Sequence, residues 1–569
     1  MMLITNHPKM TSPAANRRRP APAVSTAATI EMNGSAHGSN TLLIENDASE
    51  SAVSSSHDQK EGGTTHAENR HSDENDNDML LIQESAPRTI DSFLESAYHR
   101  NNFSPESSIL TDLCDRNKVA YHLIILALGL ANASDASEIL CLSYLLSDLN
   151  FQQDILKGGD VNNADTGNFE SGLIAASVFI GMLSGGLVVG AIADSLGRRP
   201  TLLFGLILNA AAGMLSALST NAYNLAAIRL VAGVGIGASI PPLFSLVSEL
   251  SPPSRRGLCV NIVASFWMVG SIYVAIVAIL AFQTNDWSWR AFAVLCAIPS
   301  LAGAVAVWLV VPASPRFLAK IGMVEEATEI ANTLAIKMGA NTYPQSTVVD
   351  GIDDTPQFRL LQADEIAEQF PQSQTTNIRF GGGGRTFDYK SAFVDGIKSA
   401  KELYSPNLRN GITIPLQLIW FTLSFGSYGL LTWINEIFFA INLSNVYFNA
   451  LLFAAANLPG NIFAGALLDR IGRRRLLTLA MGCSAVSLIS FAHYSQVRPD
   501  VFVPKVNSVM IVLSACSFQA FSIAAWNAID TITGEEFPTS VRSTGLGICT
   551  ASGRIGALIA QFVNSWLID

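Results

Sequence analysis

Charged residues are scarce in this chain. Asp, Glu, Lys and Arg make up 14% of its 569 residues, whereas 49% are hydrophobic. Soluble domains carry about 25% charged residues, so the composition excludes an ordinary soluble domain. It is typical of a chain embedded in a lipid bilayer, and the bilayer is therefore its first expected partner.

Signals of several other classes are also missing. Six of the seven cysteines lie in or beside apolar runs and none forms a Cys-x-x-Cys, so we expect neither a disulfide framework nor a metal site. The glycine run 381–384 is not followed by Gly-Lys-Ser/Thr, which argues against a phosphate-binding loop. The net charge is −11 and no basic face is visible, so nucleic acid is not an expected partner. We expect no cofactor and no enzyme activity.

Eleven apolar runs dominate the rest of the chain, each near the ~20 residues that a spanning helix needs. They cover 121–147, 171–193, 200–219, 223–249, 257–282, 289–311, 411–440, 447–468, 476–493, 506–532 and 543–567. The runs predict an all-α polytopic membrane protein, with one bundle over 117–311 and a second over 411–569.

Two segments lie outside these bundles. Residues 1–116 are rich in Ser, Asn, Glu and Asp without an apolar period, which predicts a disordered tail. Arg17–Arg19 at its start would also suit an organelle transit peptide, but the composition favours a solvated tail. The insert 312–410 forms a central loop, and the apolar spacing within 324–338 predicts a short amphipathic helix there.

The two bundles carry matching motifs. Gly190-Ala-Ile-Ala-Asp194-Ser-Leu-Gly197-Arg198-Arg199 recurs 275 residues later as Gly465-Ala-Leu-Leu-Asp469-Arg470-Ile-Gly472-Arg473-Arg474. Glu249-x-x-Pro252-x-x-x-Arg256 recurs 286 residues later as Glu535-x-x-Pro538-x-x-x-Arg542. Two independent pairs with similar offsets predict a duplicated half, as in many transporters. One run follows Arg542 where two follow Arg256, so a twelfth helix is missing from the symmetric plan. We expect that the chain is truncated; the alternative is a protein that ends on the outer side after eleven helices.

Basic residues gather in the short loops on one side of the predicted bundle. They are Arg198, Arg199, Arg255, Arg256, Arg470, Arg473, Arg474, Arg475 and Arg542. The positive-inside rule then predicts a cytoplasmic N-terminus. The rule does not distinguish the plasma membrane from the membrane of a vesicle or organelle.

Ionisable residues inside the apolar runs are candidates for function, because a charge in hydrocarbon normally faces a cavity or a partner. Asn132, Asp135 and Glu138 are three residues apart and share one helical face. We favour a stripe that lines a central cavity, with substrate-binding roles, over a buried pair that joins helices.

Helix rise predicts a partner for Asp135. At about 1.5 Å per residue, Asp135 lies ~21 Å above the inner face and Arg229 ~12 Å below the outer face of a core about 30 Å thick. The two could therefore pair. Separating them would favour protonation of the carboxylate, so the pair is a candidate for proton coupling; the alternative is a permanent salt bridge in a facilitator.

The C-terminal bundle holds three further candidates. Trp420 and Tyr428 have polar tips and suit the wall of a solute site, although aromatics at this spacing also serve as packing. Asp530 lies near the cytoplasmic end of its run, and we assign it to a gate.

Together these motifs resemble the major facilitator superfamily. Gly-x-x-x-Asp-x-x-Gly-Arg-Arg occurs twice, Arg229-x-x-x-Gly233-x-Gly235-x-Gly237 resembles a second signature, and Ser314-Pro315-Arg316-Phe317 resembles a third. Asp135-Ala-Ser-Glu138 is similar to the synaptic-vesicle-protein-related and organic ion branches, which share sugar-porter-like signatures.

The resemblance implies two pseudo-symmetric six-helix halves and a monomer that carries a small polar organic solute by alternating access, with proton-coupled symport. It also implies that Arg554 meets a substrate anion; the competing interpretation makes Arg554 a partner of Asp135 or Glu138. The alternative function is a non-transporting receptor or vesicle protein with the same fold.

The loop motifs are expected to act as a gate. Gly190 and Gly465 would permit close helix approach. Asp194 would meet arginines of the other half, and Glu249 with Arg256 and Glu535 with Arg542 would join this latch. The expected gating set also contains Arg198, Arg199, Asp469, Arg473 and Arg474. Ala313 stands where the family has a glutamate, which weakens the expected charge network of the N-terminal half.

Overall fold

The computed structural model describes one helical unit of the chain. The described residues are 89–99, 118–156, 164–338, 340, 360–370, 398, 400–496, 508–538 and 541–567. They belong to the larger of two compact units into which the chain divides. Most of the predicted tail and the glycine run 381–384 lie outside the described residues.

Among the described residues, eleven helices are long and apolar enough to cross a bilayer. The N-terminal half contains α4 (Val119–Leu146), α6 (Ala164–Leu196), α7 (Arg198–Ser216), α8 (Ala222–Leu250), α9 (Arg256–Ala278) with η4 (Ile279–Thr284), and α10 (Trp289–Val310). The C-terminal half contains η5 (Arg409–Thr413) with α16 (Ile414–Ala440), α17 (Val446–Ala455) with α18 (Asn457–Ile471), α19 (Arg473–Tyr494), α20 (Ser508–Glu536) and α21 (Arg542–Leu567). The prediction of an all-α polytopic protein is confirmed. That a twelfth helix is missing by truncation stays a prediction.

Glycines allow the N-terminal helices to approach closely. A Cβ at Gly235 of α8 would come within 2.7 Å of the Gly205 carbonyl oxygen and the Asn209 amide nitrogen of α7. Gly233 and Gly237, on another side of α8, face the backbone of α6 in the same way. The glycine spacing that resembles a family signature therefore lets α8 pack between α6 and α7.

One helix lies where the sequence predicts a disordered tail. Residues Ile90–His99 form α2. Its buried face consists of Ile90, Phe93, Leu94, Ala97 and Tyr98, which are 0–5% exposed. Their spacing is that of an amphipathic helix, so the prediction of an unstructured 1–116 segment is wrong here. The apolar period is only ten residues long, and the polar composition around it hides it.

The central insert packs beside α2. It contains α11 (Pro315–Lys320), α12 (Val324–Lys337) and α13 (Ala363–Gln369). The amphipathic helix predicted over 324–338 is confirmed as α12. Residues of α2, α12 and α13 share one hydrophobic cluster with α4, α7 and α8.

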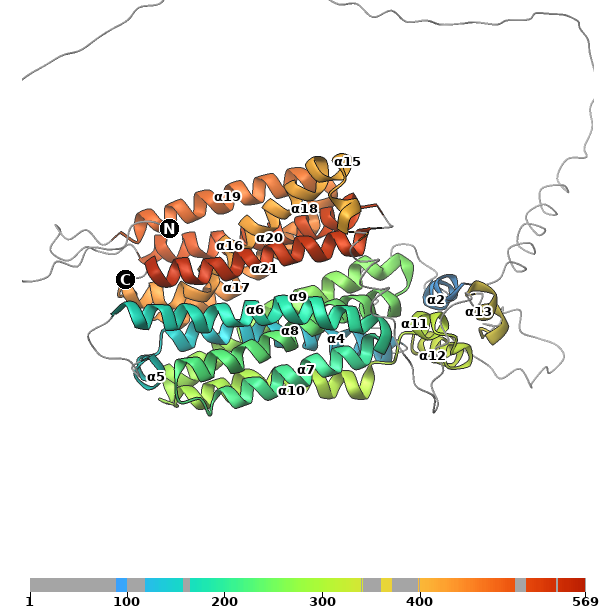
Figure 1. Ribbon diagram of the computed structural model, residues 1–569, viewed down its shortest axis with the longest axis horizontal. Helices are drawn as coiled ribbons and strands as arrows, with labels where there is room; N and C mark the ends of the chain where they lie inside the picture. Colours follow the sequence, from blue (N-terminus) through green and yellow to red (C-terminus); the bar gives the residue numbers. More distant parts are fainter. Residues whose placement is uncertain are drawn as a thin grey trace, which may run out of the picture. The chain divides into compact units, whose positions relative to one another are not determined.

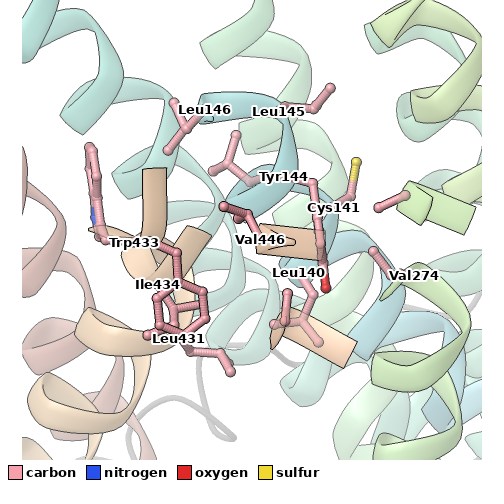
Figure 2. Close-up of a cluster of buried hydrophobic side chains, with 14 of the residues drawn as sticks. Leu140, Cys141, Tyr144, Leu145, Leu146, Val274, Leu431, Trp433, Ile434 and Val446 are labelled. Atoms are coloured by element: carbon pink, nitrogen blue, oxygen red, sulfur yellow. The ribbon is translucent and has the colours of Figure 1, made fainter. Parts of the chain in front are cut away.

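The two halves meet through α4 with α16, α6 with α21, and α9 with α17 (Figure 1). We call the end that carries Arg198, Arg256 and Arg473 the basic end. Away from it, Leu140 and Tyr144 of the N-terminal half share a buried cluster with Leu431, Ile434 and Val446 of the C-terminal half (Figure 2).

We call the end of the bundle that carries this buried cluster the opposite end. Aromatic and polar contacts also join the two halves there. Tyr447 stacks on Tyr144 with ring centroids 6.5 Å apart and on Phe282 at 5.7 Å. Asn435 donates a hydrogen bond to Ser143 Oγ (3.1 Å). Contacts described between the halves run from here to the middle of the bundle, where Phe179 meets Tyr428 and Asn461 Nδ2 donates to Ser265 Oγ.

The close approach at Gly235 predicts a strong effect of one methyl group. We expect Gly235→Ala to lower the free energy of unfolding by about 1–3 kcal/mol, because the Cβ would force α7 and α8 apart. Gly482→Ala in α19 is a matched control, since no atom lies within 4 Å of the place that its Cβ would take. Thermal unfolding of both variants in detergent tests the prediction, and equal midpoints would contradict it.

Candidate functional site

A buried ion pair joins α4 to α8. Glu138 Oε2 lies 2.8 Å from Arg229 Nη1, and each side chain is 1% exposed. Arg229 Nη2 also donates to Ser216 Oγ at 3.4 Å. A Cβ at Gly213 of α7 would overlap the Glu138 carboxylate, so this glycine makes room for the pair.

The predicted pairing of Asp135 with Arg229 is therefore wrong. Glu138 lies one helical turn beyond Asp135, a difference of about 4.5 Å that a count of helix rise does not resolve. Both partners in the observed pair belong to the N-terminal half. A rocking motion of one half against the other leaves such a pair intact.

Asp135 and Asn132 are buried against neighbouring helices. Asp135 is 0% exposed and accepts hydrogen bonds from Ser239 Oγ of α8 at 3.0 and 3.3 Å. Asn132 Nδ2 donates to the carbonyl oxygens of Val263 (3.0 Å) and Ala264 (3.2 Å) in α9. The expected cavity-lining stripe is thus wrong for this conformation. Its polar groups join α4 to α8 and α9, as in the alternative interpretation.

Arg554 of α21 interacts electrostatically with one carboxylate of each half. Its guanidinium is close enough to Asp135 in the N-terminal half and to Asp530 in the C-terminal half for electrostatic interaction with both. It also donates from Nη1 to Tyr428 Oη at 3.2 Å and lies 5.7 Å from the centre of that ring. No ion pair joins Arg554 to Asp135 among the described residues, so the interpretation of Arg554 as a partner of Asp135 stays a prediction.

Asp530 is exposed, in contrast to Asp135. The sequence assigns it to the gate from its position near the helix end, and this role stays a prediction; in the structure Asp530 interacts electrostatically with Arg554. Together, Asp135, Asp530 and Arg554 form what we call the central charge cluster. Within the described residues, no group of three potential metal ligands occurs.

Aromatic side chains surround this cluster. Tyr428 packs against Phe179 of α6 (5.1 Å between centroids) and Trp526 of α20 (6.0 Å). Trp420 is 6% exposed, and its Nε1 donates to Thr533 Oγ1 at 2.9 Å. The polar tip of Trp420 is therefore engaged inside the C-terminal half, whereas Tyr428 lies where the halves meet.

The sequence analysis does not identify a set of amide side chains in the C-terminal half. Asn457 accepts from Gln519 Nε2 at 2.9 Å, and Asn461 accepts from Asn527 Nδ2 at 2.6 Å. Trp433 Nε1 donates to Gln561 Oε1 at 2.9 Å. The presence of amide side chains in several apolar runs of the same half is the sequence signal that could have identified this set.

Arginines and acids pair symmetrically at the basic end. Arg198 lies 3.4 Å from Glu249, and the equivalent Arg473 lies 3.4 Å from Glu535. Among the described residues, Glu249 does not pair with Arg256 and Glu535 does not pair with Arg542, and their role in a latch stays a prediction. Each acid meets the arginine at the start of α7 or α19 instead.

The remaining loop residues lie as follows. Arg199 donates to the Trp308 carbonyl oxygen (2.7 Å), Arg474 pairs with Glu536 (2.6 Å), and Arg542 Nε donates to the Phe537 carbonyl oxygen (3.2 Å). The side chains of Asp194 and Asp469, and the surroundings of Gly190, lie outside the described part of the chain. No atom lies within 4 Å of a Cβ placed on Gly465, so the prediction of a close helix approach at this glycine is wrong.

Comparison with known proteins places this chain in a family. The model of the Major Facilitator Superfamily matches residues 126–561. The chain belongs to this superfamily, whose members are membrane transporters rather than enzymes.

Individual relatives include transporters and vesicle proteins. The chain is 24% identical to synaptic vesicle glycoprotein 2C of Mus musculus, over 78% of this chain and 74% of the relative. It is 27% identical to the niacin transporter NiaP of Acinetobacter baylyi, over 69% and 77%. A partially occluded inward-open structure of the xylose transporter XylE from E. coli is similar in fold, with a TM-score of 0.57, 17% identity and coverage of 79% and 94%.

The buried pair makes a testable claim on stability. We expect Glu138→Gln to cost about 3–5 kcal/mol, because Arg229 would remain buried without its counter-charge. Asp135→Asn should cost less, since Ser239 can still hydrogen-bond to an amide oxygen. Folded yield and thermal unfolding in detergent measure both variants. A milder effect of Glu138→Gln than of Asp135→Asn would refute the structural role of the pair.

Proposed function

We propose that this protein is a secondary transporter of a small polar organic solute that works by alternating access. Support comes from the distribution of contacts between the halves. They join the halves at the opposite end and in the middle. The ion pairs described at the basic end each join two residues of one half. We therefore propose that, with a cytoplasmic N-terminus, this conformation opens toward the cytoplasm.

The central charge cluster is proposed to couple transport to protons. Asp135 belongs to one half and Arg554 to the other, so rocking changes the distance between them, unlike that between Glu138 and Arg229. When Arg554 moves away, the buried carboxylate loses its counter-charge and binds a proton more readily. Alternation between paired and protonated forms would then bias the two conformations.

Tyr428, Arg554 and Asp530 are the proposed solute contacts. Tyr428 and Arg554 lie where the halves meet, and Asp530 is exposed beside them. A guanidinium suits a carboxylate or a hydroxyl-rich solute, and the neighbouring amides can bond to hydroxyl or carbonyl groups. An organic ion or a sugar-like solute fits this set. The names of NiaP and XylE support the same two solute classes.

A non-transporting membrane receptor or vesicle protein is the second candidate. The relatives named synaptic vesicle glycoproteins favour it, and they also favour a vesicle membrane over the plasma membrane. A receptor would bind a ligand and gain thermal stability without moving it across the bilayer.

Reconstituted protein distinguishes the two candidates. The full chain in liposomes, tested with a radiolabelled panel that includes niacin and xylose, should accumulate at least one solute. An acidic exterior should accelerate uptake between about pH 8 and pH 5, because protonation of Asp135 favours the reorienting form. Asp135→Asn should remove this pH dependence and retain exchange of solute for solute. Uptake that ignores pH in the unmodified protein would exclude coupling.

Arg554 gives an independent prediction. Arg554→Gln should reduce uptake at least tenfold, about 1.4 kcal/mol, because a partly buried charge-assisted contact is lost. Arg554→Lys should retain part of the activity, since the charge is kept but the planar fork is not. Arg475→Gln, on the exposed start of α19, is the control. Equal activity of Arg554→Gln and the control would remove Arg554 from the site.

A further inference from the structure

The two halves differ at the basic end in the acids that their own helices supply. In the C-terminal half, two successive acids at the end of α20, Glu535 and Glu536, pair with Arg473 and Arg474. The repeat offset of 286 residues aligns Glu536 with Leu250. Leu250 is fully buried and carries no charge. The helices of the N-terminal half therefore offer Glu249 alone at the equivalent place.

Helix α2 brings a further acid to this end, Asp91, which pairs with Arg256 and Arg316 rather than with Arg199, the repeat equivalent of Arg474. Asp91 Oδ1 lies 3.2 Å from Arg256 Nη2 at the start of α9, and it also forms an ion pair with Arg316 Nη2 of α11. One carboxylate thus connects two arginines that are 60 residues apart in the chain. Arg256 additionally donates from Nε to the Ser248 carbonyl oxygen at 2.8 Å, which fixes it to α8.

Further contacts hold α2 in place. Glu95 Oε2 accepts the backbone N–H of Ser254 at 3.0 Å, and Gln369 Oε1 of α13 accepts that of Ile90 at 3.3 Å. Phe93 and Leu94 are fully buried in the hydrophobic cluster below. Packing of α2 therefore sets the position of Asp91, and its carboxylate forms ion pairs with Arg256 and Arg316.

We propose that Asp91 is a positioning residue for the alternation of the two halves: it keeps Arg256 and Arg316 within the N-terminal half and so favours the conformation in which the basic end is open. The proposal rests on alternating access as the proposed function. Closure of this end brings acids of the C-terminal half nearer to these arginines. Asp91 competes with those acids, as a carboxylate that moves with the N-terminal half.

The competition predicts a shift of population. The ion pairs of Asp91 are partly exposed, at 28–42% for the side chains involved, so each contributes modestly. We expect Asp91→Asn to change the ratio of open to closed forms by about twofold to fivefold in favour of the closed form. Asp91→Glu should restore the original ratio.

Distance measurements in the full-length protein test this without any solute. The native cysteines are first replaced, and spin labels are attached at Gly257→Cys and Arg475→Cys, which are both exposed at the basic end. Double electron–electron resonance between the labels then reports the separation of the two halves. Asp91→Asn should enrich the shorter distance, and Ser96→Ala on the exposed side of α2 should leave the distribution unchanged. Phe93→Asn, which releases α2 as a whole, should act in the same direction as Asp91→Asn.

The outcomes separate this proposal from the proposed function. An unchanged distance distribution in Asp91→Asn would overturn the positioning role, even if hydrogen exchange of residues 89–99 becomes faster. The same shift in Ser96→Ala would overturn it as well. Absence of solute flux in liposomes would instead count against transport, and it would leave the distance result intact.

Discussion

A buried charge must find its partner inside the protein, and this constraint organises the transmembrane bundle. Hydrocarbon offers no water to Glu138 and Arg229, so their 2.8 Å pair fixes α4 against α8. Gly213 leaves space for the carboxylate, and the glycines of α8 bring its backbone against α6 and α7. The N-terminal half is thereby built as a rigid body, which is a requirement for any mechanism that moves two halves against each other.

Whether a polar contact lies within one half or between the halves decides what it can do. Contacts within a half, such as those of Asn132 with α9 and Glu249 with Arg198, preserve the shape of that half through a conformational change. Contacts between the halves, such as Asn435 with Ser143 and Phe179 with Tyr428, must form and break. Tyr428 of this second group is also a proposed solute contact.

The sequence predicts the fold in detail because apolar length and the repeated motifs are strong signals. All eleven spanning helices and α12 follow from them. Partners of charged residues are less predictable. Helix rise places Asp135 and Arg229 at one depth but does not distinguish Asp135 from Glu138 a turn away, and the spacing within Glu249-x-x-Pro252-x-x-x-Arg256 says nothing of Arg198 or Asp91. Helix α2 is too short to give a clear apolar period in the sequence. The amides of the C-terminal half carry no charge, so they do not stand out within the apolar runs.

Contacts at the two ends of the bundle depend on different forces, so temperature and ionic strength should affect the two ends differently. The stack of Tyr144, Tyr447 and Phe282 is largely apolar, and apolar association weakens on cooling. The paired arginines at the other end are partly exposed, and their attraction weakens as ionic strength rises. A change of temperature should therefore act mainly on the contacts at the opposite end, and a change of salt concentration mainly on those at the basic end.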